Sequence, residues 1–216
     1  MRRAVIFDMD GVISDTERLH VEVEQQMLAR HGIDPGLLEG GRYAAMSDRE
    51  FFPAIFGDHG IAADIEALIA EKRRALLSYP AGAVAPIPGA LELIRALRRL
   101  PLRLAVASAS APEFIEHVLG ALGVRGDFDA VASADEVARG KPEPDVFLLV
   151  AQRLHLPPAA CVVIEDGLRG MIAARRAGMR CVALAPHGED GQPLPADLVV
   201  RDLRGLTPDL LLGDTG

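Results

Sequence analysis

Six short apolar runs recur along the chain, and they constrain the fold more than any other feature of the sequence. They are rich in Val and Ile, do not alternate regularly with polar residues, and lie at 4–7, 102–107, 130–132, 161–164, 181–184 and 198–200. Runs of this kind are typical of strands buried on both faces of a parallel sheet. Helical patterns separate them, at 89–100, 111–122 and 168–177. The alternation predicts a doubly wound α/β fold with a parallel sheet.

A long helical insertion separates the first predicted strand from the second, because the gap far exceeds the length of a single crossover. It contains three helical patterns, at residues 16–31, 48–57 and 64–79. The Pro/Gly-rich segment 79–89 is the expected return linker. We therefore predict an α/β core domain formed by residues 1–15 and 85–216, and an inserted α-helical cap domain formed by residues 16–84.

Two serines are followed by a glutamate three residues later, the spacing of a capping box at a helix start. These pairs are Ser47 with Glu50 and Ser110 with Glu113. The pattern predicts that one helix begins after Ser47 and another after Ser110. In the first of these helices we expect Phe51, Phe52 and Phe56 to belong to the hydrophobic core of the cap domain.

The charge balance excludes two classes of partner. The net charge is −8, so the chain is not expected to bind nucleic acid or an anionic membrane. The apolar run at the N-terminus ends at Asp8, too early for a signal peptide. We expect a soluble, cytoplasmic protein in which Cys161 and Cys181 are buried, reduced thiols.

In doubly wound sheets, ligands bind beyond the carboxyl ends of the strands. Six polar residues follow the predicted strands at this edge: Asp8, Asp10, Ser108, Lys141, Glu165 and Asp166. Alone, several of them have simpler interpretations, because Asp-Gly is common in turns and Glu-Asp can begin a helix. Their convergence on one edge favours a functional site.

The carboxylates at this edge indicate a cation. Asp8 and Asp10 are two residues apart and project the same way from an extended strand end. Two such charges 4 Å apart repel by roughly 4 kcal/mol at an effective dielectric constant of 20. No His or Cys adjoins them in sequence, and oxygen ligands alone indicate Mg²⁺ rather than zinc. Lys141 is one of only two lysines against 21 arginines, and its compact ammonium suits contact with a carboxylate and a phosphate oxygen.

The sequence resembles the haloacid dehalogenase (HAD) superfamily, in its subgroup with a helical cap after the first strand. Four segments carry the resemblance in family order: Asp8 to Thr16 (DMDGVISDT), Val106 to Ser110 (VASAS), Gly140 to Asp145 (GKPEPD) and Val163 to Asp166 (VIED). The resemblance covers essentially the whole chain. One departure is Gly167, where relatives often carry a small hydroxyl residue.

The resemblance implies a role for each core residue. Asp8 would attack phosphorus and form an aspartyl-phosphate, while Asp10 would protonate the leaving alcohol and then activate water. Asp8, the Asp10 carbonyl and Asp166 would hold Mg²⁺, with Glu165 supporting the metal shell. Phosphoryl transfer needs positioning and charge neutralisation above all, which agrees with this set.

The resemblance also implies which residues bind the substrate. The phosphoryl oxygens would lie against Ser108, Ala109 and Lys141. Asp15 and Thr16 would form the entry hinge of the cap. Candidate specificity residues in the cap are His20, Arg42, Arg49 and Lys72, although a solvated helix face is an alternative for each.

The function we predict is a Mg²⁺-dependent phosphatase of a small phosphorylated metabolite, a sugar phosphate or phosphoglycolate. An isomerase of the β-phosphoglucomutase type is the alternative. Asp48 separates Ser47 from Arg49, however, whereas in the mutase pattern Arg directly follows Ser. A phosphonate hydrolase would need a cap lysine, and Lys72 lies in a charged run that indicates a solvated position. A non-catalytic binding module is disfavoured by the complete set of acids.

Overall fold

The computed structural model describes residues 3–40, 43, 46–186 and 193–213. It confirms the predicted doubly wound α/β fold with a single parallel sheet in the order β3-β2-β1-β4-β5-β6. The strands are β1 (Ala4–Phe7), β2 (Arg103–Ser108), β3 (Ala130–Ser133), β4 (Cys161–Glu165), β5 (Arg180–Leu184) and β6 (Leu198–Val200). The first strand, β1, lies inside the sheet between β2 and β4. The chain places β2 and β3 on one side of β1 and places β4, β5 and β6 on the other side.

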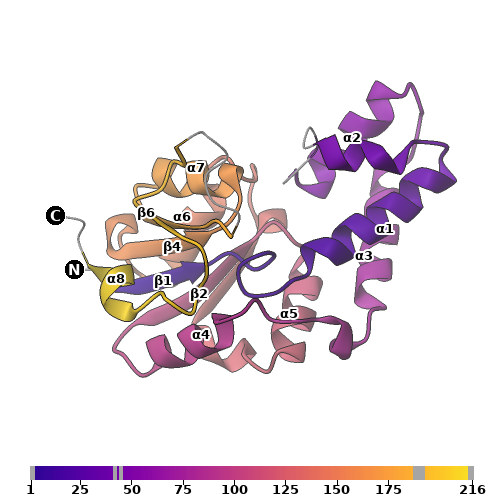
Figure 1. The fold of residues 1–216 in the computed structure, drawn as a ribbon. Helices are drawn as coiled ribbons and strands as arrows, with labels where there is room; N and C mark the ends of the chain where they lie inside the picture. The colour runs from indigo at the N-terminus through magenta and orange to yellow at the C-terminus, as the bar shows by residue number, and fades with distance from the viewer. Residues whose placement is uncertain (1–2, 41–42, 44–45, 187–192, 214–216) are drawn as a thin grey trace.

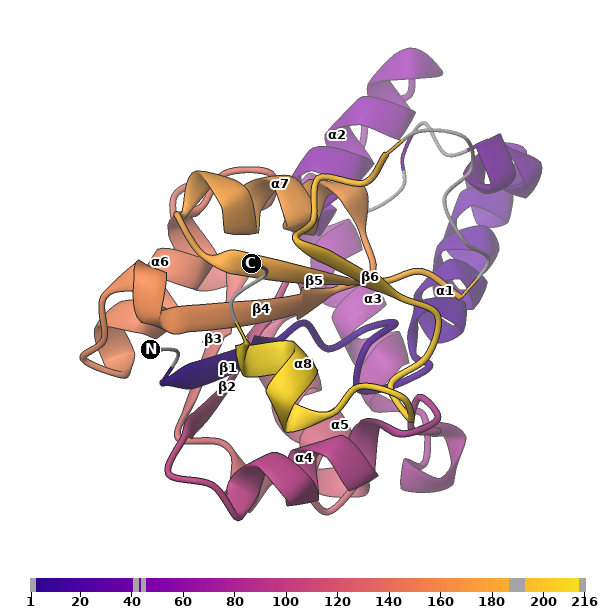
Figure 2. The ribbon, with the colours of Figure 1, turned by 60° about the vertical axis from the view of Figure 1, so that its left-hand side comes forward.

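Helices cover both faces of the sheet because successive residues of a strand point to opposite faces. The side chains of Val5 and Phe7 share a core with α4 (Ala90–Arg98) and α5 (Pro112–Ala121). Ala4 and Ile6 face the other core, with α6 (Asp145–Arg153) and α7 (Leu168–Arg176). Figure 2 shows the two helix layers on either side of the strands. Leu211 of the short helix α8 (Pro208–Leu212) joins the first core.

Three helices inserted between β1 and β2 lie together to one side of the sheet (Figure 1). They are α1 (Glu17–Arg30), α2 (Asp48–Asp58) and α3 (Ile65–Leu77). Phe51, Phe52 and Phe56 are buried, which confirms them as core residues of these helices. The arrangement agrees with an inserted helical lobe, and the predicted boundaries at residues 16 and 84 stay a prediction.

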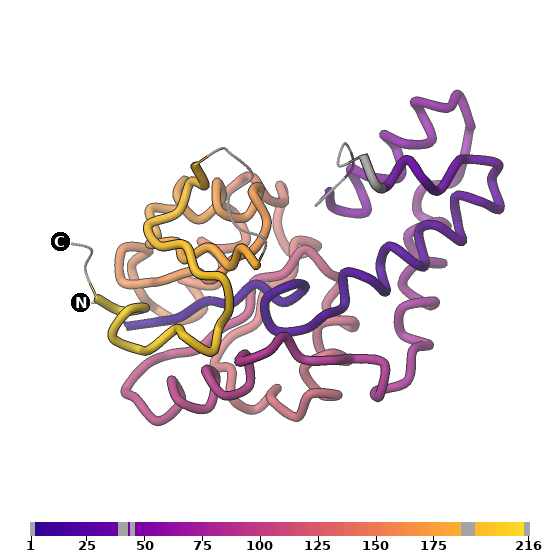
Figure 3. Tube along the Cα trace, viewed as in Figure 1, coloured from indigo at the N-terminus to yellow at the C-terminus, as the bar shows by residue number. Residues whose placement is uncertain are grey.

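Two connections join the inserted helices to the sheet, and they run side by side. The Asp15 N–H donates to the Ala85 carbonyl at 2.8 Å, and the Ile87 N–H donates to the Ile13 carbonyl at 2.9 Å. Ser14 and Pro86 form an isolated bridge between them. The trace in Figure 3 follows both connections, one indigo and one magenta. The entry and the exit of the insertion are therefore held together.

One of the two predicted helix starts is confirmed and the other is wrong. The Glu50 carboxylate accepts from the Ser47 N–H at 3.0 Å, as a capping box requires, and α2 begins at Asp48. The helix α5 instead begins at Pro112 with Ala111 at its N-cap, so Ser110 does not cap it. Proline suits the first helical turn because its missing N–H has no partner there.

Both cysteines are free and buried, as predicted. Burial raises the pKa of the Cys161 thiol to about 11 and that of the Cys181 thiol to about 12. In the part of the chain that the structure describes, no helix combines the length and the apolar character needed to cross a membrane.

Candidate active site

The strand register brings the nucleophile candidate Asp8 to the centre of the sheet edge. Phe7 is paired with Val106 of β2 and with Ile164 of β4. The residues that follow, Asp8 and Glu165, therefore emerge at the same level. The Asp8 N–H also donates to the Ile164 carbonyl at 3.0 Å, which continues the ladder by one more bond.

Lys141 joins the carboxylates at this edge. Its ammonium donates to Asp8 Oδ1 at 2.7 Å, to Glu165 Oε1 at 2.6 Å and to the Ala107 carbonyl at 3.2 Å. All three charged side chains are buried. Burial opposes the charge of the ammonium, but Asp8 and Glu165 outweigh it and raise the pKa of Lys141. Lys141 is therefore a fixed positive charge between two carboxylates.

Three carboxylates at this edge could hold a divalent cation. Asp8, Glu165 and Asp166 each offer one oxygen, and these oxygens lie within 4.8 Å of one another. Burial raises the pKa of Asp166 to about 8, and the negative charges of Asp8 and Glu165 add to the effect. A hard cation with oxygen ligands, such as Mg²⁺, fits this donor set because it would offset charge that Lys141 alone cannot.

Two glycines make room for these carboxylates. A Cβ at Gly11 would lie 2.0 Å from Asp166 Oδ2, and a Cβ at Gly170 would lie 1.7 Å from Glu165 Oε1. Gly11 also has a φ of +83°, which favours glycine. Gly170 was not predicted, because nothing in the sequence shows that α7 must pass so close to Glu165.

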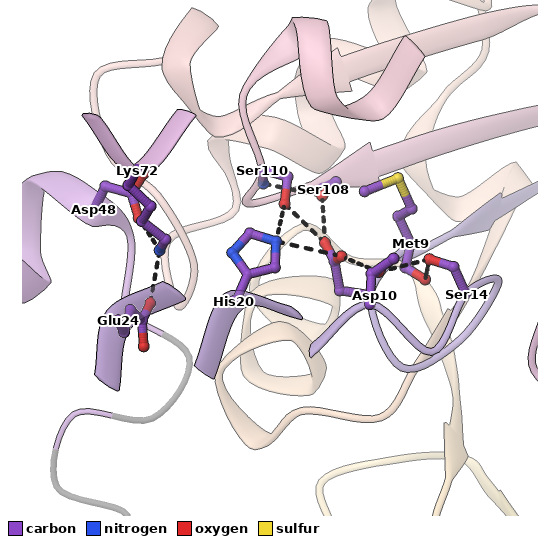
Figure 4. A network of polar contacts seen from close by, with 10 residues as sticks. Met9, Asp10, Ser14, His20, Glu24, Asp48, Lys72, Ser108 and Ser110 are labelled. Atoms are coloured by element: carbon purple, nitrogen blue, oxygen red, sulfur yellow. Dashed lines mark hydrogen bonds and ion pairs between the residues drawn. The ribbon is translucent and has the colours of Figure 1, made fainter. Parts of the chain in front are cut away.

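Asp10 is held by three hydroxyl groups from two segments of the chain (Figure 4). Thr16 donates to its Oδ1 at 2.5 Å. Ser110 donates to its Oδ2 at 2.8 Å, and Ser108 donates to the same oxygen at 3.3 Å. Donors on both oxygens fix the orientation of the carboxyl group.

Ser110 is a site residue that the sequence interpretation missed, because it was assigned to a helix cap. The available signal was its spacing from Ser108, since residues two apart project the same way from an extended strand end. Ser108 is fully buried. Its Oγ also accepts the Ser110 N–H at 3.0 Å, which holds the turn between β2 and α5.

We expect Ser110→Ala to lower kcat by about tenfold, because a hydrogen bond to a charged group contributes about 1.5–3 kcal/mol. The measurement is steady-state phosphate release, compared with Ser78→Ala. The Ser78 hydroxyl also forms a hydrogen bond, to the Ala75 carbonyl, but lies in the exposed turn after α3. Equal kcat values for the two variants would contradict a role for Ser110 in holding Asp10.

His20 lies beside Asp10, with Nε2 at 3.7 Å from Asp10 Oδ1 and 3.4 Å from Ser110 Oγ. Burial lowers the pKa of His20 to about 3, and the charge of Lys72 adds to the effect. The imidazole is therefore neutral at pH 7. It packs edge-on against the ring of Phe114, with 5.1 Å between the ring centroids.

The expectation that Lys72 is solvated is wrong. Its side chain is 4% exposed and donates to Glu24 Oε1 at 2.6 Å and to Asp48 Oδ1 at 2.5 Å (Figure 4). These acids outweigh the effect of burial and raise the pKa of Lys72. The charged run around Lys72 obscured this position, because a run of charges in the sequence does not show that one of them packs against carboxylates of α1 and α2.

Of the remaining predicted site residues, some line the cavity between the sheet and the inserted helices and others do not. Ala109 lines the cavity described below. Arg49 does not line it, and its exposed guanidinium pairs with Glu66 at 2.5 Å. Arg42 lies outside the described residues. Thr16 is buried against Asp10 as noted, whereas the Asp15 side chain is 54% exposed and pairs with Arg18.

A cavity of about 250 Å³ lies between the sheet edge and the inserted helices. At one end it is lined by the candidate catalytic and metal-binding residues Asp8, Asp10, Lys141 and Asp166. The opposite wall is lined by Tyr43, Met46, Phe51, Lys72 and Leu76. A substrate in this cavity would contact the carboxylates at one end and the inserted helices at the other.

Comparison with known proteins gives a consistent result. The haloacid dehalogenase-like hydrolase family matches residues 2–178. The fructose-1-phosphate phosphatase YqaB of Escherichia coli is 37% identical over 179 residues, which cover 82% of this chain and 94% of that protein. The β-phosphoglucomutase of Bacillus subtilis is 33% identical over 219 residues, which cover 97% of this chain and 93% of that protein.

The fold also matches solved structures. The crystal structure of CbbY from Rhodobacter sphaeroides in complex with phosphate has a TM-score of 0.83 and 28% sequence identity. The match covers 95% of this chain and 96% of that one. The likeness therefore extends over both the sheet and the inserted helices.

Proposed function

The chain belongs to the haloacid dehalogenase-like hydrolases and is a phosphoric monoester hydrolase, and from this premise we propose that it is a Mg²⁺-dependent sugar-phosphate phosphatase. The observation that carries the proposal is the arrangement of Asp8 and Asp10. Asp8 faces Lys141, and Asp10 is held separately by hydroxyl groups. Two carboxylates in different environments suit a nucleophile and a general acid.

In the proposed reaction, a carboxylate oxygen of Asp8 attacks phosphorus and the bond from phosphorus to the alcohol oxygen breaks. Asp10 donates its proton to that oxygen. Asp10 then takes a proton from the water that attacks the aspartyl-phosphate, and inorganic phosphate leaves. Lys141, Ser108 and the backbone at Ala109 would hold the phosphoryl oxygens, which carry the charge in the transition state.

Asp8, the Asp10 carbonyl and Asp166 would hold the Mg²⁺ ion, which neutralises negative charge on the phosphoryl oxygens when bound. Glu165 would support this site without being one of its principal ligands. One of its oxygens already accepts from Lys141 at 2.6 Å, and the other accepts from the Gly167 N–H at 2.9 Å. Its role in the proposal is therefore to orient Lys141 and add negative charge near the ion.

The charges of the cavity wall favour a neutral sugar over a second anionic group. Among the described residues that line the cavity, each cation away from the reacting end already has a carboxylate partner. Lys72 pairs with Glu24 and Asp48, Arg73 with Asp135, and Arg169 with Glu50. A sugar monophosphate suits such a wall better than phosphoglycolate does, because burying an unpaired carboxylate is costly.

A cytoplasmic location is also part of the proposal. It is supported by the two free thiols, since cysteines in oxidising compartments are commonly paired. The proposed partner is a small phosphorylated metabolite, with no nucleic acid and no membrane.

The isomerase alternative differs in the fate of the aspartyl-phosphate, which a mutase must protect from water until a second sugar phosphate arrives. The mutase pattern expects Arg directly after Ser in the cap loop. Here Arg49 follows Asp48 and pairs with Glu66 outside the cavity, which supports the phosphatase.

We expect net release of inorganic phosphate from sugar monophosphates without a bisphosphate activator. The test is incubation with β-glucose 1-phosphate and a trace of glucose bisphosphate, measuring free phosphate and glucose 6-phosphate together. Fructose 1-phosphate and phosphoglycolate are assayed in parallel for phosphate release. Glucose 6-phosphate in large excess over phosphate would replace the phosphatase by the isomerase.

A further inference from the structure

Arg169 contacts the sheet-bearing lobe and the inserted helices at the same time. Its Nε donates to the Lys141 carbonyl at 2.9 Å, and its Nη2 donates to both carboxylate oxygens of Glu50 at 2.8 Å. Lys141 follows β3, whereas Glu50 lies in the first turn of α2. One guanidinium therefore connects the backbone of the phosphate-binding lysine to the inserted helices.

The position of Arg169 within its own helix is unfavourable. It is the second residue of α7, and a helix N-terminus carries a partial positive charge that disfavours cations. The same helix places Arg175 and Arg176 in its last turn, where cations are favoured. The stability of α7 therefore does not explain an arginine at position 169, and its two partners do.

Glu50 in turn orders the start of α2. Its carboxylate accepts from the N–H and from the hydroxyl of Ser47, each at 3.0 Å. Burial opposes the charged form, but Ser47 and Arg169 outweigh it and hold the pKa of Glu50 below its usual value. Ser47 lines the cavity, and its Cβ would lie 3.9 Å from a Cβ at Gly140, beside Lys141. The start of α2 and the Lys141 loop are thus direct neighbours.

We propose that Arg169 is a positioning residue that couples closure of the inserted helices over the cavity to the placement of Lys141. The proposal rests on the phosphatase function proposed above. When the helices move away, the guanidinium loses its anionic partner and its hold on the Lys141 carbonyl weakens. The Lys141 ammonium must lie between Asp8 and Glu165 to bind the phosphoryl group. Full activity is therefore confined to the closed arrangement.

The chain offers a matched control in Arg176, which lies on the same helix. Its Nη1 donates to the Pro142 carbonyl at 3.1 Å and pairs with Glu143 at 2.7 Å. It therefore holds the same loop as Arg169 but contacts a carboxylate of that loop instead of one on the inserted helices. Arg176→Gln removes an arginine from α7 and a bond to the loop, and leaves the contact between the lobes in place.

The kinetic test compares Arg169→Gln, Glu50→Gln, the double variant and Arg176→Gln with fructose 1-phosphate. We expect kcat to fall about tenfold in Arg169→Gln, and less in Glu50→Gln, with smaller changes in KM. The double variant should be no slower than Arg169→Gln, because both changes break one linkage. Arg176→Gln should lower kcat less than Arg169→Gln does, because the contact between the lobes stays in place, and its effect should multiply with that of Glu50→Gln. Arg169→Lys should remain slow, since an ammonium lacks the fork that reaches both partners.

The second readout is hydrogen exchange in peptides covering 46–56 and 139–147, measured on the unliganded protein. Glu50→Gln should speed exchange in 139–147 at least about twofold, although Glu50 does not contact that segment. Arg176→Gln should speed exchange in 139–147 alone. Melting temperatures check that each variant is folded. If Arg169→Gln does not fold, the result with Glu50→Gln decides the test.

Unchanged exchange of 139–147 in Glu50→Gln, or independent kinetic effects that multiply in the double variant, would overturn the coupling. Failure of the parent protein to release phosphate from any sugar phosphate would instead overturn the proposed function. The exchange experiment would still decide the coupling in that case, because it needs no substrate.

Discussion

We expect Asp8→Asn to abolish phosphate release, lowering kcat by a factor of about 10³ or more, while the protein stays folded. The amide is a much weaker nucleophile than the carboxylate, so the aspartyl-phosphate cannot form. The fold should tolerate the change because the Lys141 ammonium keeps Glu165 as a partner at 2.6 Å. Removing one of three crowded carboxylates also relieves repulsion at this edge of the sheet.

The measurement is phosphate release at saturating fructose 1-phosphate, with melting temperature as the check on folding. Trapping of a phosphorylated protein after acid quench, and its absence in the variant, adds a direct readout. Arg139→Gln is a suitable control, because this exposed arginine pairs with Asp145 away from the cavity lining. Substantial turnover by Asp8→Asn would refute covalent catalysis through Asp8.

We expect removal of divalent cations with EDTA to lower activity by roughly a thousandfold and Mg²⁺ to restore it, since the charge stabilisation that a metal supplies contributes several kcal/mol. The acids that would bind the ion should not be equivalent. Asp166→Ala should weaken Mg²⁺ binding more than Glu165→Gln, because both Glu165 oxygens are already engaged by Lys141 and Gly167.

Titration calorimetry with Mg²⁺ measures binding in the absence of turnover, and phosphate release measures activity. Full activity in EDTA would exclude the metal from the mechanism. Stronger loss of Mg²⁺ affinity in Glu165→Gln than in Asp166→Ala would instead make Glu165 the principal ligand.

Several parts of the fold were predictable because they depend on short stretches of chain. The apolar runs, which do not alternate with polar residues, predicted the parallel strands, because a strand buried on both faces carries apolar side chains on both faces. The length of chain between the first two strands predicted the inserted helices. The capping pattern at Ser47 correctly marked the start of α2, since that contact is local.

The same local pattern failed at Ser110, where a tertiary contact decided the outcome. Its hydroxyl bonds to Asp10, which lies far away in sequence, and Pro112 begins the helix instead. Lys72 failed for a related reason. A charged run normally lies in solvent, but the helix rotation turns Lys72 toward Glu24 and Asp48, which are on two other helices.

The sequence by itself determined the order of strands and helices and the chemical set of the site: Asp8, Asp10, Ser108, Lys141, Glu165 and Asp166. These features follow from residue type and from spacing along one segment. Only the tertiary structure decided which groups meet across segments. It placed Ser110 on Asp10, made room for Glu165 at Gly170, turned Arg49 outward and joined Arg169 to Glu50. Contacts of this kind depend on how whole elements pack, and no local pattern in the chain encodes them.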